Sequence, residues 1–278
     1  MSKSRVPRRR GASVRLCATC GWDNGYPNVR QAETEEEFLS GRLREAEARA
    51  TQRQCLGQLN ALREDVKKSV AVIVTNPNKA YALLNDPSEL YTTFYRVVAS
   101  GTRMPRPNWF DQVRGVADEL LFPNYREYIS FAALSLDGVG SSHYGNVHLV
   151  LADFAIRERA TAFEENSLLF CEKHRLGVHE KIAPGHRSTW KQRDRLAVAK
   201  LEPKLSPTTQ PEDFSGIVLS REEAFDGDFI EVHIYERLNR QSIQRVLVKT
   251  GGSEDDAIMK ELIVRVCGRN DIACQEIP

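Results

Sequence analysis

The sequence predicts an α+β fold: a helical N-terminal half with a candidate zinc knuckle, followed by a mixed β-sheet unit with flanking helices. Two observations predict this class. Apolar residues recur with helical periodicity up to about residue 128, and after it they alternate or run continuously in short segments. The hydrophobic content of 41% in 278 residues is enough to build a sizeable core.

The pattern divides the chain into four segments. They are a disordered basic arm at 1–16, a candidate zinc knuckle at 17–30, a helical region at 31–128 and an α+β region at 129–278. The arm contains Lys3 and five arginines but no acid. It is either a tether for nucleic acid, whose phosphates attract such clusters, or a solvated tail.

A Cys-x2-Cys pair, Cys17 and Cys20, is half of a zinc site. The spacing of Cys171 and His174 makes them the most ligand-like candidates for the other half, although Cys55, Cys267 and Cys274 are further candidates. Unbound reduced thiols and a redox pair are the alternatives. Six scattered cysteines without a signal peptide indicate a reducing, cytoplasmic location.

Helical periodicity extends from Thr34 to about Val74, which predicts one long helix that begins at a capping box of Thr34 and Glu37. Glycine and proline residues at the ends of helical segments predict three further helices, at 78–84, 87–100 and 109–121.

The second half begins with a predicted pair of strands at 129–136 and 146–152, joined by a glycine-rich connection. Helices are predicted near 166–174 and over 189–201. Three later strands, at 216–220, 229–235 and 243–249, precede a final helix at 255–267.

Several classes of protein are excluded. The formal charge of +1 gives no overall field that would attract nucleic acid or a membrane, and no apolar run reaches the roughly 20 residues of a membrane-spanning helix. The sequence has no P-loop, no nucleophile elbow and no His-Glu-x-x-His motif, which argues against the corresponding NTPases, hydrolases and proteases.

The clearest candidate site follows the strand at 146–152. Glu164, Glu165, Asn166 and Ser167 lie between Phe163 and the apolar run 168–170, with Arg157 and Arg159 just before them. A carboxylate held beside apolar groups and arginines can orient a hydroxyl, stabilise a developing cation or act as a general base. The same residues would also suit an ordinary capped helix start.

Two other clusters are candidates for ligand binding. The connection at 136–148 combines glycines with His143 and Tyr144, and it is either a cofactor loop or a plain hairpin loop. The segment 184–201 holds six potential cations, which either bind phosphate or form a solvated helix face.

The segments "HYGNVHLVL" at 143–151 and "IRERATAFEENS" at 156–167 resemble bacterial toxin-like proteins of the ADP-ribosyltransferase type, some of them encoded around phages and phage-defence systems. The resemblance covers about 30 of the 278 residues. It implies a mixed α+β fold that holds NAD in a cleft between two sheets and ADP-ribosylates a macromolecule, either protein or nucleic acid. It also leaves room for an inhibitory partner protein.

The resemblance implies roles for particular residues. His143 or Tyr144 would lie near the nicotinamide, and Glu164 or Glu165 would orient the ribose and stabilise the transition state. The remaining cofactor-binding candidates are Arg157 and Arg159, near the pyrophosphate, with Asn166 and Ser167 beside them.

Two other classes of function compete with the transferase. A nucleic-acid-binding or nucleic-acid-cleaving protein would use the basic arm and the zinc knuckle for phosphates, with His186, Arg187 and Arg193 as a basic active site. A non-enzymatic adaptor would use the helix at 34–74 as its partner surface.

Overall fold

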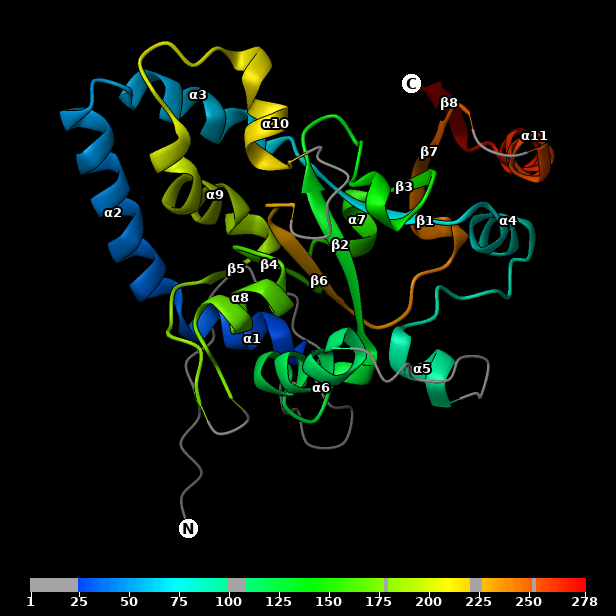
Figure 1. Ribbon diagram of the computed structural model, residues 1–278, viewed down its shortest axis with the longest axis horizontal. Coiled ribbons are helices and arrows are strands. Elements are labelled where there is room, and N and C mark those ends of the chain that lie inside the picture. Colours follow the sequence, from blue (N-terminus) through cyan, green and yellow to red (C-terminus); the bar gives the residue numbers. More distant parts are fainter. Residues whose placement is uncertain (1–24, 100–108, 178–179, 221–226, 252–253) are drawn as a thin grey trace.

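The computed structural model describes residues 25–99, 109–177, 180–220, 227–251 and 254–278, and it shows a mixed α and β chain built around one sheet (Figure 1). The described residues form an eight-stranded sheet in the order β5-β4-β6-β2-β1-β3-β7-β8. Neighbouring strands are antiparallel except for β7 and β8, which are parallel. The strands are β1 (Val70–Thr75), β2 (Ile129–Ser135), β3 (Val147–Leu151), β4 (Ala160–Phe163), β5 (Arg187–Thr189), β6 (Glu231–Tyr235), β7 (Ile243–Lys249) and β8 (Ala273–Ile277).

Helices lie on both faces of this sheet. The α-helices are α1 (Pro27–Thr34), α2 (Glu36–Gln52), α3 (Leu56–Lys67), α4 (Pro77–Asn85), α5 (Phe94–Ala99), α6 (Trp109–Leu121), α7 (Asp153–Ile156), α8 (Ser167–Lys173), α9 (Arg193–Leu201), α10 (Phe214–Val218) and α11 (Glu254–Arg269). Short 3-10 turns occur at η1 (Arg126–Tyr128), η2 (Ser142–Tyr144), η3 (Trp190–Gln192), η4 (Glu202–Lys204), η5 (Pro211–Asp213) and η6 (Arg240–Ser242).

The largest core lies on one face of the sheet, which we call the core face. It contains alternate strand residues such as Ile73, Leu134 and Val232, together with apolar side chains of α2, α3, α4, α9, α10 and α11. In Figure 1, α2, α3 and α9 lie together at one end, while α4 and α11 pack together at the other. Because side chains alternate along a strand, the remaining positions point to the opposite face.

That opposite face, the site face, is covered less completely. Phe163 of β4 and Ile129 of β2 pack there against Leu121 and Phe122 at the end of α6 and Phe170 of α8. Farther along the sheet, Val72, Val150 and Leu247 form a separate small cluster. The candidate site described below lies between these two clusters, where the site face is uncovered.

The prediction of one helix from Thr34 to Val74 is wrong. The helix breaks between α2 and α3, where Gln54 has a φ of 59° and Cys55 precedes the first turn of α3. Helical periodicity ends at Val66, and the run "VAVIVT" is the central strand β1. Three β-branched valines and an isoleucine in six residues favour a strand, and this preference outweighs the apparent continuation of the helix.

The predicted strands at 129–136 and 146–152 both form, but they do not pair with each other. β1 lies between them, pairing with β2 on one side and β3 on the other. The connection between β2 and β3 therefore crosses over β1. At Gly145 an added Cβ would come within 2.3 Å of the Thr75 carbonyl oxygen, so the crossing requires a residue without a side chain.

Other predictions differ in part. Residues 216–220, predicted as a strand, begin inside α10, and only α5 forms within the helix predicted at 87–100. Strands β4, β5 and β8 were not predicted, because they are short or lie at the edges of the sheet. The helices at 78–84, 109–121, 166–174 and 255–267 and the strands at 229–235 and 243–249 are confirmed to within a few residues, as is most of the helix at 189–201.

The division into segments at 16, 30 and 128 stays a prediction. The arm lies outside the described residues, and β1 belongs to the same sheet as the strands that follow residue 128. Within the described chain, no helix has the length and apolar character needed to cross a membrane.

Candidate active site

A cavity of about 430 Å³ lies on the site face of the sheet. Its floor is formed by β1, β2 and the start of β6, and its rim by the α4 end of β1, the crossing connection, α6 and the start of α8. This volume falls in the range of ligand-binding clefts. Its polar and aromatic lining includes Lys79, Tyr91, Arg114, Phe131, Ser141, Tyr144, Asn166, Ser167 and Glu231.

Glu231 is the buried carboxylate of this cavity. It is the first residue of β6, lies opposite Ala133 of β2 and Phe163 of β4, and is only 6% exposed. Its Oε2 accepts the Ser167 backbone N–H at 3.1 Å and lies 2.8 Å from the His233 Nε2. Its Oε1 makes no hydrogen bond within the described ranges, so Oε2 is the oxygen that the fold engages.

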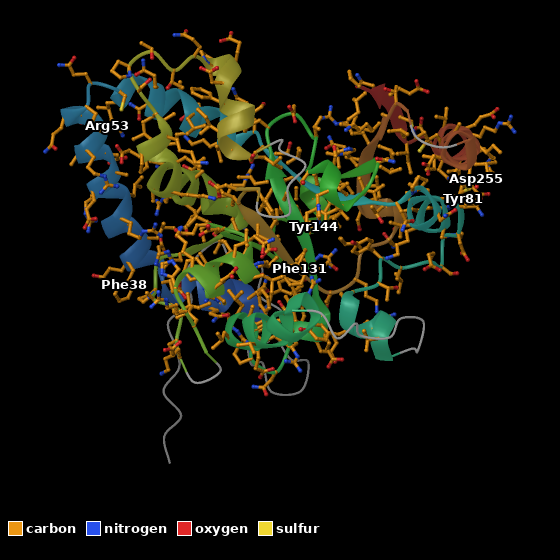
Figure 2. All side chains as sticks on the ribbon, viewed as in Figure 1. Phe38, Arg53, Tyr81, Phe131, Tyr144 and Asp255 are labelled. Atoms are coloured by element: carbon orange, nitrogen blue, oxygen red, sulfur yellow. The ribbon has the colours of Figure 1, made fainter. Side chains whose placement is uncertain are left out.

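An aromatic side chain forms part of the rim. Tyr144, at the end of η2, is 45% exposed, and its hydroxyl lies 3.5 Å from the Asn166 amide nitrogen. Burial of its hydroxyl end, together with the nearby charge of Glu231, raises the pKa of Tyr144 to about 12. The hydroxyl therefore stays protonated at neutral pH. In Figure 2, Tyr144 and Phe131 lie near the middle of the molecule, where both line the cavity.

α6 supplies a cation to the cavity. The Arg114 guanidinium lies over the Phe131 ring, 5.1 Å from its centroid, and its Nε lies 3.5 Å from Asp118 Oδ2. Asp118 is buried, and the Tyr95 hydroxyl donates to it at 2.7 Å. Burial raises the pKa of Asp118, while Arg114 and the hydrogen bond from Tyr95 oppose that effect. Asp118 and the Phe131 ring thus hold Arg114 in place in the lining of the cavity, which Glu231 also lines.

Three of the predicted site residues lie in this cavity: Tyr144, Asn166 and Ser167. The side chain of Asn166 caps α8 by accepting the N–H groups of Leu168 and Leu169. The capped helix start considered as an alternative therefore exists, and the same turn presents the Ser167 N–H to Glu231.

The predicted catalytic carboxylates do not line the cavity. Glu164 accepts from Arg42 at 2.6 Å and lies 2.7 Å from the His186 ring nitrogen. Burial alone would raise the pKa of Glu164, but His186 and Arg42 outweigh it and hold the pKa below its usual value. Glu165 pairs with Lys173 at 3.2 Å. Both carboxylates therefore already have side-chain partners within the fold.

His143, Arg157 and Arg159 also lie outside the cavity lining. Arg157 is an exposed surface residue whose Nε lies 3.7 Å from Glu158. Arg159 donates to the backbone carbonyls of Ala155, Tyr235 and Arg237, which ties the start of β4 to the end of β6.

The zinc site stays a prediction. Cys17 and Cys20 lie outside the described residues. Cys171 is buried in α8, and the His174 ring packs on Phe170 with centroids 4.3 Å apart. Across the described ranges, no group of three or more His, Cys, Asp or Glu side chains is arranged to hold a metal ion.

The cations of the segment 184–201 are used inside the fold. Arg187 pairs with Glu35 at 2.9 Å, and Arg193 donates to Ser69 Oγ at 3.0 Å. The other pairs are His186 with Glu164, Lys191 with Glu158, Arg195 with Glu36 and Lys200 with Asp228. The buried Arg187 and Arg193 therefore have a structural role, whereas Lys191 is exposed, as the solvated face considered as the alternative requires.

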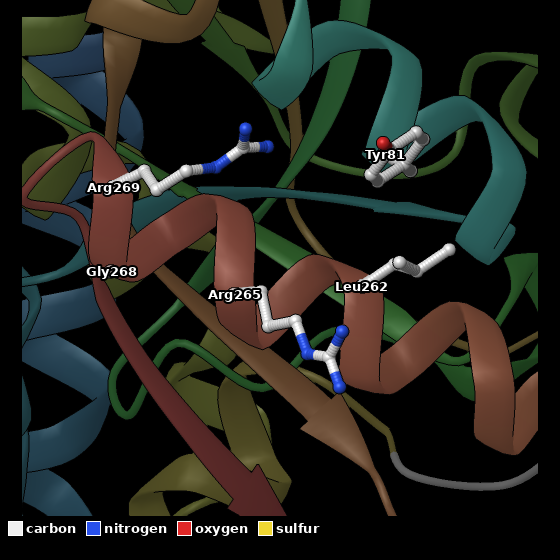
Figure 3. A pocket seen from close by; sticks show the side chains of 5 residues that line it. All are labelled: Tyr81, Leu262, Arg265, Gly268 and Arg269. Atoms are coloured by element: carbon white, nitrogen blue, oxygen red, sulfur yellow. The ribbon is translucent and has the colours of Figure 1, made fainter.

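A second, more open depression of about 670 Å³ lies between α4 and α11 (Figure 3). Its arginines do not converge in Figure 3: Arg265 pairs with Glu261, and Arg269 donates to Asn85. With Tyr81, Leu262 and Gly268 as the other lining residues, it presents no carboxylate. The cavity around Glu231 is therefore the better candidate for chemistry.

Glu231 and His233 were not among the predicted site residues, although the sequence contains a signal for them. In the segment "FIEVHIY" at 229–235, polar side chains alternate with Ile230, Val232 and Ile234. Alternation places Glu231, His233 and Tyr235 on one face of the strand, so a carboxylate and an imidazole are neighbours on that face. The apolar residues by themselves predict only that the segment is a strand.

No protein-family model matches the chain, and no curated protein matches it. Among solved structures, it is similar to DarT of Thermus sp. 2.9 in complex with NAD+, with 11% identity, a TM-score of 0.38 and coverage of 76% of this chain and 95% of that chain. The same protein in complex with ADP-ribosylated ssDNA gives 10% identity and a TM-score of 0.37, over 76% of this chain and 94% of that chain.

Proposed function

We propose that this protein transfers ADP-ribose from NAD to a macromolecule, with the cavity around Glu231 as its active site. The observation that carries the proposal is a buried carboxylate with one oxygen fixed and the other free, in a cavity that also holds an aromatic ring and an arginine. The resemblance of residues 143–167 to ADP-ribosyltransferase-type proteins supports the same class of reaction.

The reaction breaks the glycosidic bond between the nicotinamide nitrogen and the ribose C1′, and the electron pair leaves with nicotinamide. The ribose then develops oxocarbenium character, which a nearby carboxylate stabilises. Glu231 would supply that negative charge, with Oε1 accepting a hydrogen bond from a ribose hydroxyl. A nucleophilic atom of the acceptor forms the new bond to C1′ and loses a proton to solvent or a basic group.

Other residues of the cavity would bind the dinucleotide. The ring of Tyr144 offers an aromatic surface for nicotinamide, and its protonated hydroxyl can donate a hydrogen bond. Arg114, and Lys79 in the first turn of α4, place positive charge where a pyrophosphate could be held. Asn166 and Ser167 line the same cavity and would contact the dinucleotide as well.

The experiment that tests the proposal follows label from adenylate-labelled NAD into cell protein, DNA and RNA, supplied separately. We expect wild-type protein to label one acceptor class and Glu231→Gln to lose at least about 100-fold of that rate, since removing a charge that stabilises a transition state costs about 3 kcal/mol or more. Glu261→Gln, on the far helix α11, is the matched control and should label as wild type does.

Glu164→Gln and Glu165→Gln test the two carboxylates chosen from sequence alone. Loss of labelling in either variant, with a normal rate in Glu231→Gln, would return the catalytic role to that residue. No labelling by folded wild-type protein would instead favour the nucleic-acid-binding or adaptor alternatives. Toxicity, a phage-defence context, an inhibitory partner and a cytoplasmic location stay expectations from the sequence.

A further inference from the structure

His233 lies beside Glu231 on the site face of β6. The two residues are separated by Val232, whose side chain points to the core face, and both are almost completely buried. The ring nitrogen Nε2 lies 2.8 Å from Glu231 Oε2. An ionised carboxylate can only accept hydrogen bonds, so in that form of Glu231 the donor of this contact is a proton on Nε2.

Three phenylalanine rings enclose the imidazole. Phe163 stacks on it with centroids 5.7 Å apart, while Phe122 and Phe131 meet it edge-on at 4.7 and 5.4 Å. Packing on three sides restricts rotation of the ring, so the Nε2 proton keeps a fixed direction. Phe131 also lines the cavity and lies under Arg114, which connects this enclosure to the active site.

Charged groups approach this pair from the helices above it. Asp118 and Arg114 come from α6, and the charge of Asp118 is coupled to both Glu231 and His233. Cys171 comes from α8, and burial, together with the negative charges of Asp118 and Glu231, raises the pKa of its thiol to about 12. The thiol is therefore neutral at ordinary pH, and it adds no charge beside the carboxylate.

The two hydrogen bonds to Oε2 have different origins. The Ser167 N–H belongs to the backbone at the start of α8, and the His233 donor belongs to the same strand as the carboxylate. Together they fix one carboxylate oxygen on both sides, while no hydrogen bond among the described residues engages Oε1. A charge-assisted hydrogen bond of this kind is about twice as strong as a neutral one.

We propose that His233 is a positioning residue, which holds Glu231 Oε2 through Nε2 so that Oε1 meets the ligand. The inference rests on the proposed function, because it assigns His233 a task in the same reaction. His233 itself would not touch NAD, since the cavity lining includes Glu231 but not His233.

The test compares His233→Leu with His233→Gln in the full-length protein, measuring nicotinamide release. Leucine removes the donor, whereas the amide nitrogen of glutamine can replace Nε2. We expect His233→Leu to lower kcat by about 10- to 100-fold, as loss of a hydrogen bond to a charged group does, with KM for NAD changed by less than about threefold. We expect His233→Gln to recover most of kcat.

Two outcomes would overturn the inference while the proposed function stands. If His233→Leu released nicotinamide at the wild-type rate, the carboxylate would need no support from the imidazole. An equal loss in both variants, with equal thermal stability, would show that the ring acts by packing rather than by donating its proton.

A second readout applies even if the wild-type protein releases no nicotinamide, a result that would count against the proposed function. By NMR, the Nε2 proton of His233 should give a downfield, slowly exchanging signal in wild-type protein that is lost in Glu231→Leu. A signal that is absent from wild type, or unchanged in Glu231→Leu, would contradict the hydrogen bond itself and overturn the inference.

Discussion

Glu164 and Glu231 differ in what surrounds their carboxylates. Glu164 is held by the Arg42 guanidinium of α2 and by the ring of His186, the residue just before β5. Glu231, which lines the cavity, is held by a backbone N–H and one imidazole, both at Oε2, and within the described ranges Oε1 makes no hydrogen bond. A carboxylate that must stabilise a developing cation needs a free oxygen, so residue-level geometry favours Glu231.

His148 gives a prediction for acid stability. Its Nδ1 accepts the Gly140 N–H at 2.9 Å, and its burial, with the charge of Lys249, lowers the pKa of His148 to about 4. The folded state favours the neutral ring. The contribution of His148 to the free energy of unfolding is therefore complete above pH 6.5, and it is lost as the pH falls towards 4. At full effect it is worth about 3 kcal/mol.

In His148→Asn, the amide oxygen can still accept from Gly140 but cannot titrate. We therefore expect urea unfolding between pH 6.5 and pH 4 to show a smaller fall in stability than in wild type, by up to about 3 kcal/mol. Parallel pH profiles for the two proteins would show that His148 is not the titrating group.

At the scale of elements, the connection between β2 and β3 crosses β1 at positions where only glycine fits. Gly145 has a φ of 144° and lies against the Thr75 carbonyl. Gly140 lies on the side chains of Val72 and Val74, so an added Cβ there would clash with both. Gly140 and Gly145, two glycines of the candidate cofactor loop, are thus required for close packing on the central strand.

Gly145→Ala should therefore destabilise the protein by more than about 2 kcal/mol, through the steric contact and the unfavourable backbone angle. Gly57→Ala is the matched control, because Gly57 lies in α3 with no atom near an added Cβ. It should raise stability by about 0.5–1 kcal/mol. Thermal and urea unfolding would measure both, and a similar small effect at the two positions would refute this account of the crossing.

Local pattern predicted the elements better than their pairing. The apolar runs at β2, β3, β6 and β7 were sufficient to predict those strands, but no local signal shows that β1 separates β2 from β3. Tyr144, Asn166 and Ser167 line the cavity, and local sequence was sufficient to propose them because they are close to strand ends. Glu231 is about 65 residues from Asn166, and they meet only through the β2–β6 and β4–β6 pairings.

At the scale of the whole molecule, one sheet joins the two halves of the chain. β1 comes from the region predicted as helical, and it lies between β2 and β3. Its alternate residues also belong to both the large core and the cluster on the site face. The cavity depends on this arrangement, because β1 forms part of its floor.

A fragment of residues 129–278 should therefore fail to fold alone, since β2 and β3 would lose their shared neighbour and much of the core. We expect the full chain to unfold in one cooperative transition. Circular dichroism and tryptophan fluorescence would monitor this unfolding. A folded fragment, or two separate transitions in the full chain, would instead support the division at residue 128.

The central claim is that the cavity around Glu231 binds NAD and breaks its glycosidic bond. The most direct measurement is nicotinamide release by wild-type and Glu231→Gln proteins, with NAD affinity determined calorimetrically for both. We predict that Glu231→Gln binds NAD within about tenfold of wild type and releases nicotinamide at least about 100-fold more slowly. Equal rates of release in the two proteins, or no binding of NAD to folded wild-type protein, would contradict the claim.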